Sequence, residues 1–180
     1  MDRKLFQTIR LKDVEPNTKL ELHVKNAIQN FRCKDSDVEN FLKNKAFEFE
    51  RRSKSRTYLI FEGVNLLAYY TLSLHSLEFD ESISKNSIKK IDGFSKSVKS
   101  VGIVLIGQLG KDINLGKSIT GAYLLDKCLR AALRVQDVVG GRYALLECTE
   151  EPKVVEFYKS NGFEVLQKAD EKYLQMIKKL

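Results

Sequence analysis

One tyrosine stands where its hydroxyl group could take part in chemistry. Tyr158 falls in the segment VVEFYKSNGFEVL (residues 154–166), near the end of a short amphipathic helix and just before an Asn-Gly stop and a new strand. A phenol is a proton donor with a pKa of about 10. The residues alone leave two interpretations open. Either Tyr158 packs in the core with its hydroxyl hydrogen-bonded, or that hydroxyl faces a reaction.

The segment GKDINLGKSITG (residues 110–121) has the features of an anion-binding loop. A buried strand precedes it and a helix follows, so free backbone N–H groups and the helix dipole would point at whatever binds there. The ending LGKS is similar to that of a P-loop, but a P-loop has four residues between its two glycines. Five residues separate Gly110 from Gly116, which argues against a nucleoside triphosphatase. A pyrophosphate cradle of another type and a plain strand-to-helix turn both stay open.

Few other side chains favour a known catalytic arrangement. His23 and His75 are the only histidines, and their spacing supports neither a Ser-His-Asp nor a Cys-His arrangement. His75 follows an expected strand and either lines an acceptor site or is incidental. Cys128 and Cys148 fit buried, small apolar positions.

Length, charge and cysteine usage limit the class of protein. The 180 residues fit one domain, 1–180, with a full hydrophobic core. The net charge of +7 is compatible with an anionic partner such as a nucleotide cofactor or RNA. The three cysteines form no CxxC pair, so neither a disulfide framework nor a zinc site is expected. A reducing, cytoplasmic setting is expected instead. No apolar run reaches membrane-spanning length and the N-terminus lacks a signal-peptide core, so no membrane association is expected.

Hydrophobic periodicity predicts the elements that would position these residues. In the first half it predicts a strand near residues 5–11, a helix over residues 33–53 capped by Asp35 or Ser36, and a hairpin over residues 56–74. The polar segment 82–99 contains one candidate helical turn and is expected to be a mobile insertion.

The second half alternates strands with helices. The predicted ranges are a strand at 101–109, a helix at 117–135, a strand at 142–148, a helix at 149–161 and a closing hairpin. Thr149 is the candidate N-cap of the last helix, and Gly162 supplies its stop. The pattern predicts a mixed α/β (α+β) fold around one central sheet.

From Phe31 to the C-terminus, this order of parts resembles the GCN5-related N-acetyltransferase (GNAT) family. In that family a strand–loop–helix unit binds the pyrophosphate of acetyl-CoA, the next strand splays away, and a later helix carries a tyrosine in a pattern ending Phe-Tyr-x-x-x-Gly-Phe. The chain reads Phe157-Tyr158-Lys159-Ser160-Asn161-Gly162-Phe163 at that place. The resemblance implies a single-domain GNAT-like fold. Its mixed, mostly antiparallel sheet is splayed between the 101–109 and 142–148 strands, with helices on both faces.

The first half is similar to one subgroup of that family, which includes the aminoacyl-tRNA-acetylating toxins of bacterial toxin–antitoxin pairs. That subgroup shows Phe-x-Cys, an aspartate before a short helix, and a Tyr-Tyr-x-Leu strand. These features fall at Phe31, Cys33, Asp37 and Tyr69-Tyr70-Thr71-Leu72.

The pyrophosphate loop departs from the family pattern Gln/Arg-x-x-Gly-x-Gly/Ala. Gly116 stands where Gln or Arg is expected and Ile119 where the first glycine is expected, while Gly121 matches. Ile119 narrows the allowed backbone and would crowd the phosphates, whereas Lys111 and Lys117 supply compensating charge. The resemblance implies the following acetyl-CoA-binding residues: Leu109, Gly110, Lys111, Gly116, Lys117, Ser118, Ile119, Thr120 and Gly121.

The resemblance also implies a mechanism, which needs no metal. A primary amine attacks the thioester carbon while backbone N–H groups at residues 109–111 polarise its carbonyl. Tyr158 then gives a proton to the departing CoA thiolate. Glu147 is the one carboxylate placed by register to act as the base. Alternatively, Glu147 is a solvated or salt-bridged residue at the end of its strand. A chain of water molecules could then act as the base.

Three functions stay open. The first is an acetyl-CoA-dependent N-acetyltransferase for a small-molecule or peptide amine. The second is a toxin that acetylates aminoacyl-tRNA, with an antitoxin and a second copy of the chain as candidate partners. The third is a non-catalytic acyl-CoA-binding or scaffold protein that has kept the fold.

Overall fold

The computed structural model describes residues 6–180, which form two compact units. The first unit contains the chain up to Ser73 and Gln108–Cys128, and the second contains Leu74–Gly107 and Leu129–Leu180. The strands are β1 Phe6–Arg10, β2 Arg56–Glu62, β3 Asn65–Glu78, β4 Ser100–Lys111, β5 Tyr143–Thr149, β6 Glu164–Lys168 and β7 Tyr173–Lys179. The helices are α1 Lys19–Asn30, α2 Ser36–Asn44, α3 Ala46–Arg51, α4 Lys85–Asp92, α5 Gly121–Val139 and α6 Pro152–Ser160, with short 3-10 turns η1 Leu11–Asp13 and η2 Gly116–Ser118.

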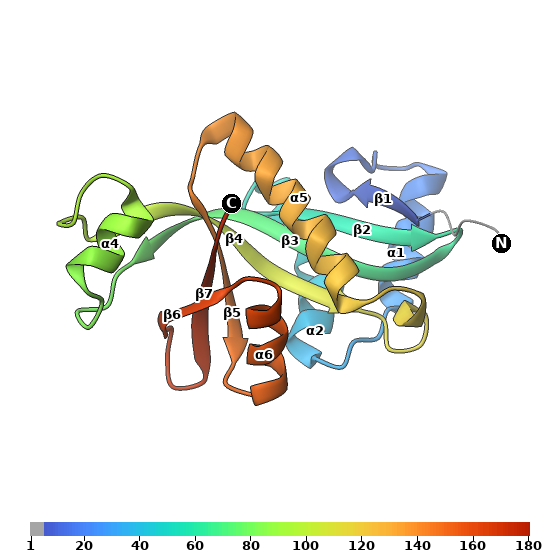
Figure 1. Cartoon of the computed structure of the whole chain (residues 1–180). Coiled ribbons are helices and arrows are strands. Elements are labelled where there is room, and N and C mark those ends of the chain that lie inside the picture. Colours follow the sequence, from blue (N-terminus) through green and yellow to red (C-terminus); the bar gives the residue numbers. More distant parts are fainter. Residues whose placement is uncertain (1–5) are drawn as a thin grey trace. The chain divides into compact units, whose positions relative to one another are not determined.

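These strands form one mixed sheet in the order β1-β2-β3-β4-β5-β7-β6 (Figure 1). The β1–β2, β2–β3, β5–β7 and β6–β7 pairs are antiparallel, and β4–β5 is parallel. The parallel register joins only Val104–Ile106 to Ala144–Leu146, although both strands continue beyond it. The sheet and its flanking helices confirm the predicted GNAT-like α/β class. The single domain over 1–180 stays a prediction.

The hairpin of the first unit follows the sequence closely. Glu62 pairs with Asn65, so the loop is Gly63-Val64, and Gly63 has the positive φ of 58° that such a tight turn requires. Strand β3 extends beyond the predicted end of the hairpin, to Glu78. The first strand begins at Phe6, and the predicted strand residue Leu5 lies outside the described residues.

The predicted helix over residues 33–53 is two helices, α2 and α3, separated at Lys45. Asp35 is the N-cap of α2, because its carboxylate accepts hydrogen bonds from the N–H groups of Asp37 and Val38. Helix α1 was not predicted. Its signal is a partial capping box, in which the Thr18 hydroxyl accepts the N–H of Glu21.

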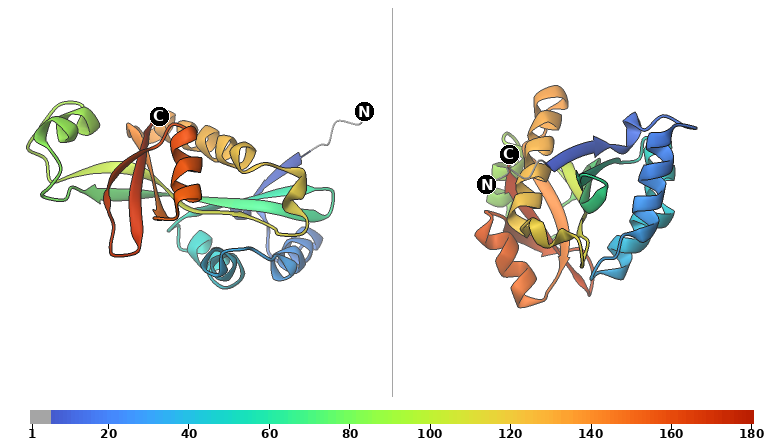
Figure 2. Two further views of the ribbon diagram at one scale, coloured as in Figure 1. Left: turned by 60° about the horizontal axis from the view of Figure 1, so that its bottom comes forward. Right: turned by 90° about the vertical axis from the view of Figure 1, so that its right-hand side faces the viewer.

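Helices α1 to α3 cover one face of the hairpin in the first unit (Figure 2). Their apolar side chains bury the same side of strands β2 and β3 and form the core of this unit. The buried members are Leu11, Val24, Ile28, Phe31, Leu42, Ala46, Leu59, Phe61, Leu66 and Tyr69. The core of the second unit consists of Leu77, Ile91, Ile103, Tyr143, Leu145 and Ile177.

The second half corrects two predicted helix starts. Thr149 is the last residue of β5 and not an N-cap, because α6 begins at Pro152, whose missing N–H suits a first helical turn. Helix α5 begins at Gly121 and not at residue 117, because residues 116–118 form the η2 turn. Gly162 ends α6 with a φ of 83°, as predicted. The closing hairpin β6–β7 is also confirmed.

The predicted mobile segment 82–99 contains helix α4, which Ser84 caps and Gly93 ends with a φ of 92°. Its mobility stays a prediction. Among residues 6–180, no helix has the length and apolar character needed to cross a bilayer.

Candidate functional site

The loop between β4 and α5, in the first unit, is organised by Asp112, whose side chain is buried. One carboxylate oxygen accepts the backbone N–H groups of Asn114 and Leu115, each at 2.8 Å, and the other accepts the N–H of Arg32 at 2.8 Å. The backbone N–H of Asp112 itself bonds to the carbonyl of Leu67 on β3. Asp112 was not predicted from the sequence as a functional residue, because its bond to the N–H of Arg32 joins positions that are remote in the chain.

Two of the predicted cofactor-binding glycines are required by close packing. A Cβ on Gly116 would lie 2.8 Å from the backbone carbonyl oxygen of Leu67. A Cβ on Gly110 would lie 2.6 Å from the Val38 side chain of α2 and 3.0 Å from the ring of Tyr69. The chain therefore approaches its neighbours as closely here as glycine allows.

The structure places the Ile119 side chain in the interior of the first unit. Its backbone is extended, with φ −123° and ψ 146°, which suits a β-branched residue. Its side chain is only 3% exposed and so packs inside the unit, away from the solvent-facing side of the loop. The Lys111 ammonium donates a hydrogen bond to the Ile119 carbonyl. The Ile119 side chain is therefore not part of the exposed surface of the loop.

The start of α5 presents hydrogen-bond donors. Thr120 caps the helix, and its hydroxyl accepts the N–H of Tyr123. The N–H groups of Gly121 and Ala122 precede the first intrahelical bonds and have no partner within the helix. The Ser118 hydroxyl is buried and has no hydrogen-bond partner among residues 6–180, and the exposed Lys117 adds positive charge. This set of donors fits a pyrophosphate-sized anion.

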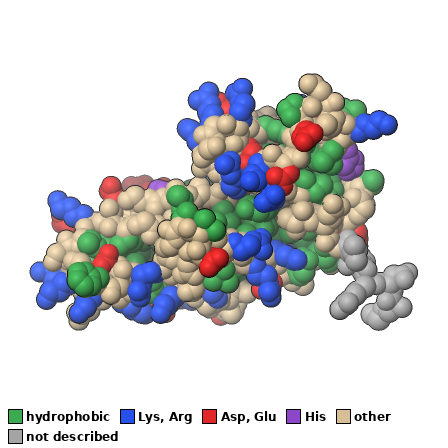
Figure 3. All heavy atoms as spheres, turned by 90° about the horizontal axis from the view of Figure 1, so that it is seen from above, with side chains coloured by type: hydrophobic (Ala, Val, Ile, Leu, Met, Phe, Trp, Pro, Cys, Tyr) green, Lys and Arg blue, Asp and Glu red, His purple; other side chains and the backbone are tan. Residues whose placement is uncertain are grey.

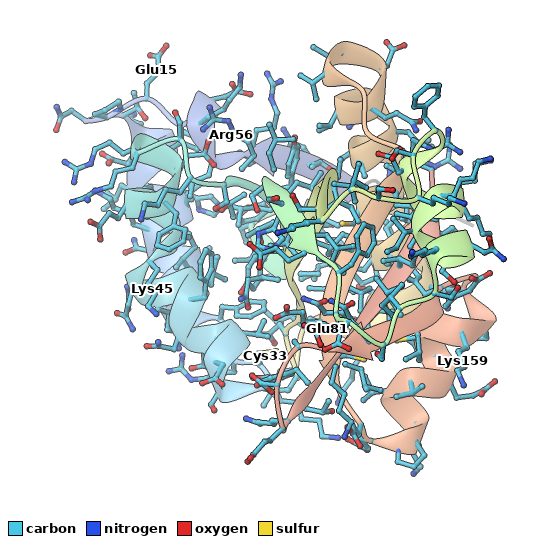
Figure 4. The ribbon with its side chains drawn as sticks, turned by 90° about the vertical axis from the view of Figure 1, so that its left-hand side faces the viewer. Glu15, Cys33, Lys45, Arg56, Glu81 and Lys159 are labelled. Carbon is cyan, nitrogen blue, oxygen red and sulfur yellow. The ribbon has the colours of Figure 1, made fainter. Side chains whose placement is uncertain are left out.

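The subgroup residues of the first half pack around the end of β4. The Tyr69 hydroxyl donates to the carbonyl of Val38, and the Tyr69 ring meets Phe31 edge-on at a centroid distance of 5.7 Å. Burial raises the pKa of Tyr69 far above its ordinary value. The Cys33 sulfur lies 3.5 Å from the position that a Cβ on Gly110 would take (Cys33 is labelled in Figure 4). These residues therefore shape the β4 end by packing.

All three cysteines are expected to react slowly as thiols. Burial raises the pKa of Cys33, which the N–H of Asp35 only partly offsets, and burial also raises the pKa values of Cys128 and Cys148. Because the thiolate is the nucleophile, a raised pKa lowers the reactive fraction at pH 8. We expect no labelling of the native protein by iodoacetamide in the time that fully labels free cysteine, and three labels in urea. Rapid labelling of Cys33 in the native state would contradict this.

Tyr158 lies in the second unit on α6, the helix that Lys159 marks in Figure 4. It is half-buried between two aromatic rings, with centroid distances of 5.1 Å to Phe157 and 5.8 Å to Phe163. Phe163 is buried and Phe157 is partly buried, as expected for packing residues. The rings hold the phenol in one orientation while part of it stays accessible.

Glu147 faces solvent from β5 and accepts a hydrogen bond from a buried amide. The Gln175 Nε2 atom of β7 donates to a Glu147 carboxylate oxygen at 2.9 Å. The Gln175 oxygen in turn accepts from Gln167 Nε2 of β6 at 2.7 Å, and the Gln167 oxygen accepts the N–H of Asp80 at 3.0 Å. This chain fixes which way each amide points. The sequence analysis missed both glutamines because a bulge in β6 brings Gln167 opposite Gln175.

The Gln175 amide orients the Glu147 carboxylate, so a glutamate at position 175 would place two carboxylates side by side. In Gln175→Glu, a second carboxylate beside Glu147 disfavours its ionised form and raises its pKa. If Glu147 is the base, the acidic limb of the pH–rate profile moves to higher pH by about 1 unit. On the acidic side of that limb kcat falls roughly 10-fold, whereas kcat at pH 7 changes little.

The neutral Gln175→Met is the matched control for that charge. It removes the donor without adding a carboxylate, so its kcat falls while the limb moves less than in Gln175→Glu. Identical pH profiles for the two variants would assign the glutamine a packing role only.

The histidines take no part in a shared site. His23 on α1 lies against the Phe61 ring, and His75 is exposed on β3. Across residues 6–180, His, Cys, Asp and Glu side chains form no group of three that could hold a metal ion.

Comparisons with known proteins define the class of fold. No family model matches the chain. A structure of AtaT complexed with acetyl-methionyl-tRNAfMet is 25% identical, with a TM-score of 0.70 over 94% of this chain and 93% of that chain. A tyrosine-to-phenylalanine variant of KacT is 25% identical, with a TM-score of 0.66 over 82% of this chain and 85% of that chain.

A further neighbour supports the fold alone. It is an AtaT toxin variant bound to acetyl-CoA and the C-terminus of the antitoxin AtaR, with 22% identity and a TM-score of 0.66 over 94% and 91% of the two chains. AtaT and KacT are GNAT-fold toxins. The chain therefore has the GNAT fold, and its solved neighbours are toxins of that fold.

Proposed function

We propose that this chain is an acetyl-CoA-dependent N-acetyltransferase whose acceptor is the α-amine of an aminoacyl-tRNA. The observation that carries the proposal is the loop from β4 to α5, which combines tightly packed glycines with helix N–H groups that have no partner within the helix. The neighbour AtaT, solved with acetyl-methionyl-tRNAfMet, supports the choice of acceptor. The net charge of +7 suits a polyanionic substrate.

In this proposal the first unit binds the cofactor. The N–H groups of Gly121 and Ala122, the Ser118 hydroxyl and the Lys117 ammonium would hold the pyrophosphate of acetyl-CoA. Gly116 and Lys111 keep the loop in place: Gly116 packs against β3, and Lys111 bonds the Ile119 carbonyl. Backbone N–H groups at residues 109–111 would polarise the thioester carbonyl.

The second unit supplies the proton-transfer groups. The acceptor nitrogen forms a bond to the thioester carbon as the carbon–sulfur bond breaks, and the proton on Tyr158 Oη moves to the sulfur. Glu147, held by the Gln175 amide, would take the proton that the amine loses. A phenol suits the acid role because its ordinary pKa of about 10 is close to that of a thiol.

The proposal also concerns the setting of the protein. A toxin that acts on aminoacyl-tRNA works in the cytoplasm, where that substrate is found. The partner of such a toxin is an antitoxin, as in the neighbour solved with the C-terminus of AtaR. A homodimer is compatible with the proposal but is not needed for it.

Calorimetry with acetyl-CoA and a charged-tRNA assay together test the proposal. We expect micromolar acetyl-CoA affinity, no binding of ATP as the control anion, and transfer of labelled acetyl to aminoacyl-tRNA. Binding without transfer to any amine would favour the non-catalytic acyl-CoA-binding protein. Transfer to small amines only would keep the enzyme class and exclude the tRNA acceptor.

A further inference from the structure

The second unit carries a pocket that contains Arg142, is separate from Tyr158 and Glu147 in the sequence and has no assigned role. It lies where α4 and the following turn meet the starts of β4 and β5, and its volume is about 330 Å³. Its lining includes Asp92, Ser100, Gly102, Gly141 and Arg142. A pocket of this size holds a small polar group, such as one unit of a nucleic-acid backbone.

Arg142 is an unpaired cation in this pocket. Its guanidinium lies against Gly93, since a Cβ on that glycine would lie 2.3 Å from an Arg142 Nη atom. The side chain is exposed, and it makes no ion pair or side-chain hydrogen bond among residues 6–180. Packing therefore positions the guanidinium while its N–H donors stay available for a ligand. The planar, forked arrangement of these donors matches the geometry of a phosphate.

The segment that packs against this arginine through Gly93 is rich in lysine. Residues 80–100 contain five lysines against three carboxylates, and all five ammonium side chains are exposed: Lys85, Lys89, Lys90, Lys96 and Lys99. Only Lys90 has an ion pair in the described part of the chain, to Glu164 at 3.6 Å. Figure 3 shows Lys and Arg side chains gathered at the α4 end of the chain, at the left of the view.

The carboxylate that lines the pocket is already engaged. One oxygen of Asp92 accepts the N–H groups of Phe94 at 3.1 Å and Ser95 at 2.6 Å, so Asp92 shapes the turn after α4. The same turn leaves the Phe94 ring 89% exposed. An exposed aromatic ring beside unpaired cations is the combination on which nucleic-acid bases stack while phosphates are neutralised.

We infer that Arg142, Lys89, Lys96 and Phe94 form an RNA-backbone contact site, which we call the α4 site. The inference rests on the proposed function and extends it. The α4 site contacts phosphates and an unpaired base of the tRNA body, so it contributes affinity but no chemistry. It recognises the negative charge of the RNA backbone and does not distinguish one RNA sequence from another.

The decisive experiment compares tRNA binding by variants of equal net charge. We expect Arg142→Gln with Lys89→Gln to weaken tRNA binding about 10-fold at 100 mM salt. We also expect it to reduce the slope of log affinity against log salt by about 1 to 2, since each lost phosphate contact releases one fewer counterion. The control Lys45→Gln with Arg51→Gln, on exposed positions of the first unit, should change neither value substantially.

Two further variants test whether weaker tRNA binding comes from misfolding or from the loss of charge alone. Lys89→Gln with Lys96→Gln alters only exposed side chains, and it should lower the salt slope without changing the Tm. Phe94→Ala should weaken tRNA binding with no change in the slope, because stacking releases no counterions.

The readouts separate this inference from the proposed function. Acetyl transfer to a small aminoacyl amide should be the same in all these variants, because none removes Tyr158 or Glu147. If no variant transfers acetyl to any amine but tRNA binding falls as expected, the α4 site stands and the enzyme proposal fails. Unchanged tRNA binding in the Arg142 variant overturns the α4 site, as does loss of antitoxin binding alone, which would assign this surface to a protein partner.

Discussion

Replacing Tyr158 with phenylalanine is expected to lower kcat for acetyl transfer about 100- to 10,000-fold, the range that a general acid contributes. The ring contacts to Phe157 and Phe163 survive in Tyr158→Phe, so packing of the ring changes little while the hydroxyl group is lost. The acetyl-CoA dissociation constant should stay within about 2-fold, because the proposed pyrophosphate donors lie in the first unit. Rapid-quench kinetics with labelled acetyl-CoA measure the chemical step.

Tyr143→Phe is the matched control for that variant. It also removes a phenol from the second unit, but from a buried position in the core of that unit. It should leave kcat unchanged. Full turnover by Tyr158→Phe would remove the proposed acid and leave Tyr158 with only its packing role.

Adding one methyl group at Gly116 is expected to damage the cofactor loop. In Gly116→Ala the new Cβ would lie 2.8 Å from the Leu67 carbonyl oxygen and 3.2 Å from the Lys111 Cβ. The first neighbour is backbone in a central strand and cannot move aside, so the loop must shift away from β3. Overpacking of this kind costs about 1–3 kcal/mol of the free energy of unfolding. We expect a lower Tm and acetyl-CoA affinity reduced at least about 10-fold.

Gly102→Ala is the control for the loss of a glycine. Gly102 is on β4, its φ is not in the left-handed region, and a Cβ there would meet no atom within 4 Å. We expect its Tm to be equal to or slightly above that of the parent protein, with acetyl-CoA affinity unchanged. If both variants bind acetyl-CoA with the parental constant, the loop from β4 to α5 is a strand-to-helix turn and not a cradle.

Local chemistry accounts for the features that the sequence predicted well. The β2–β3 hairpin was recognisable because Gly63 permits a tight turn between two runs of strand-forming residues. The α6 segment ended as predicted because Gly162 can adopt a positive φ. The Asp35 cap was one of two alternatives, and its carboxylate does accept the two N–H groups that open α2. Each of these depends on residues within a few positions of one another.

The missed features depend on partners that are remote in the chain. Nothing in the residues around Asp112 indicates that its carboxylate bonds Arg32, 80 positions away. The order Glu147–Gln175–Gln167 depends on β7 lying between β5 and β6 and on a bulge that shifts the register of β6. Successive side chains in a β-strand point to opposite faces of the sheet. A bulge that was not predicted therefore changes which side chains face one another across neighbouring strands.

The sequence by itself determined the order of most elements, though not helix α1. It also determined the Phe-Tyr-x-x-x-Gly-Phe pattern around Tyr158 and the presence of a glycine-containing loop before a helix. Only the tertiary structure decided what that loop is able to do. The family pattern predicted that Ile119 would crowd the phosphates of the cofactor. In the structure its side chain is buried, and its carbonyl accepts a hydrogen bond from Lys111. The direction in which a side chain points follows from packing against neighbours that are distant in the chain, and sequence spacing carries no information about those neighbours.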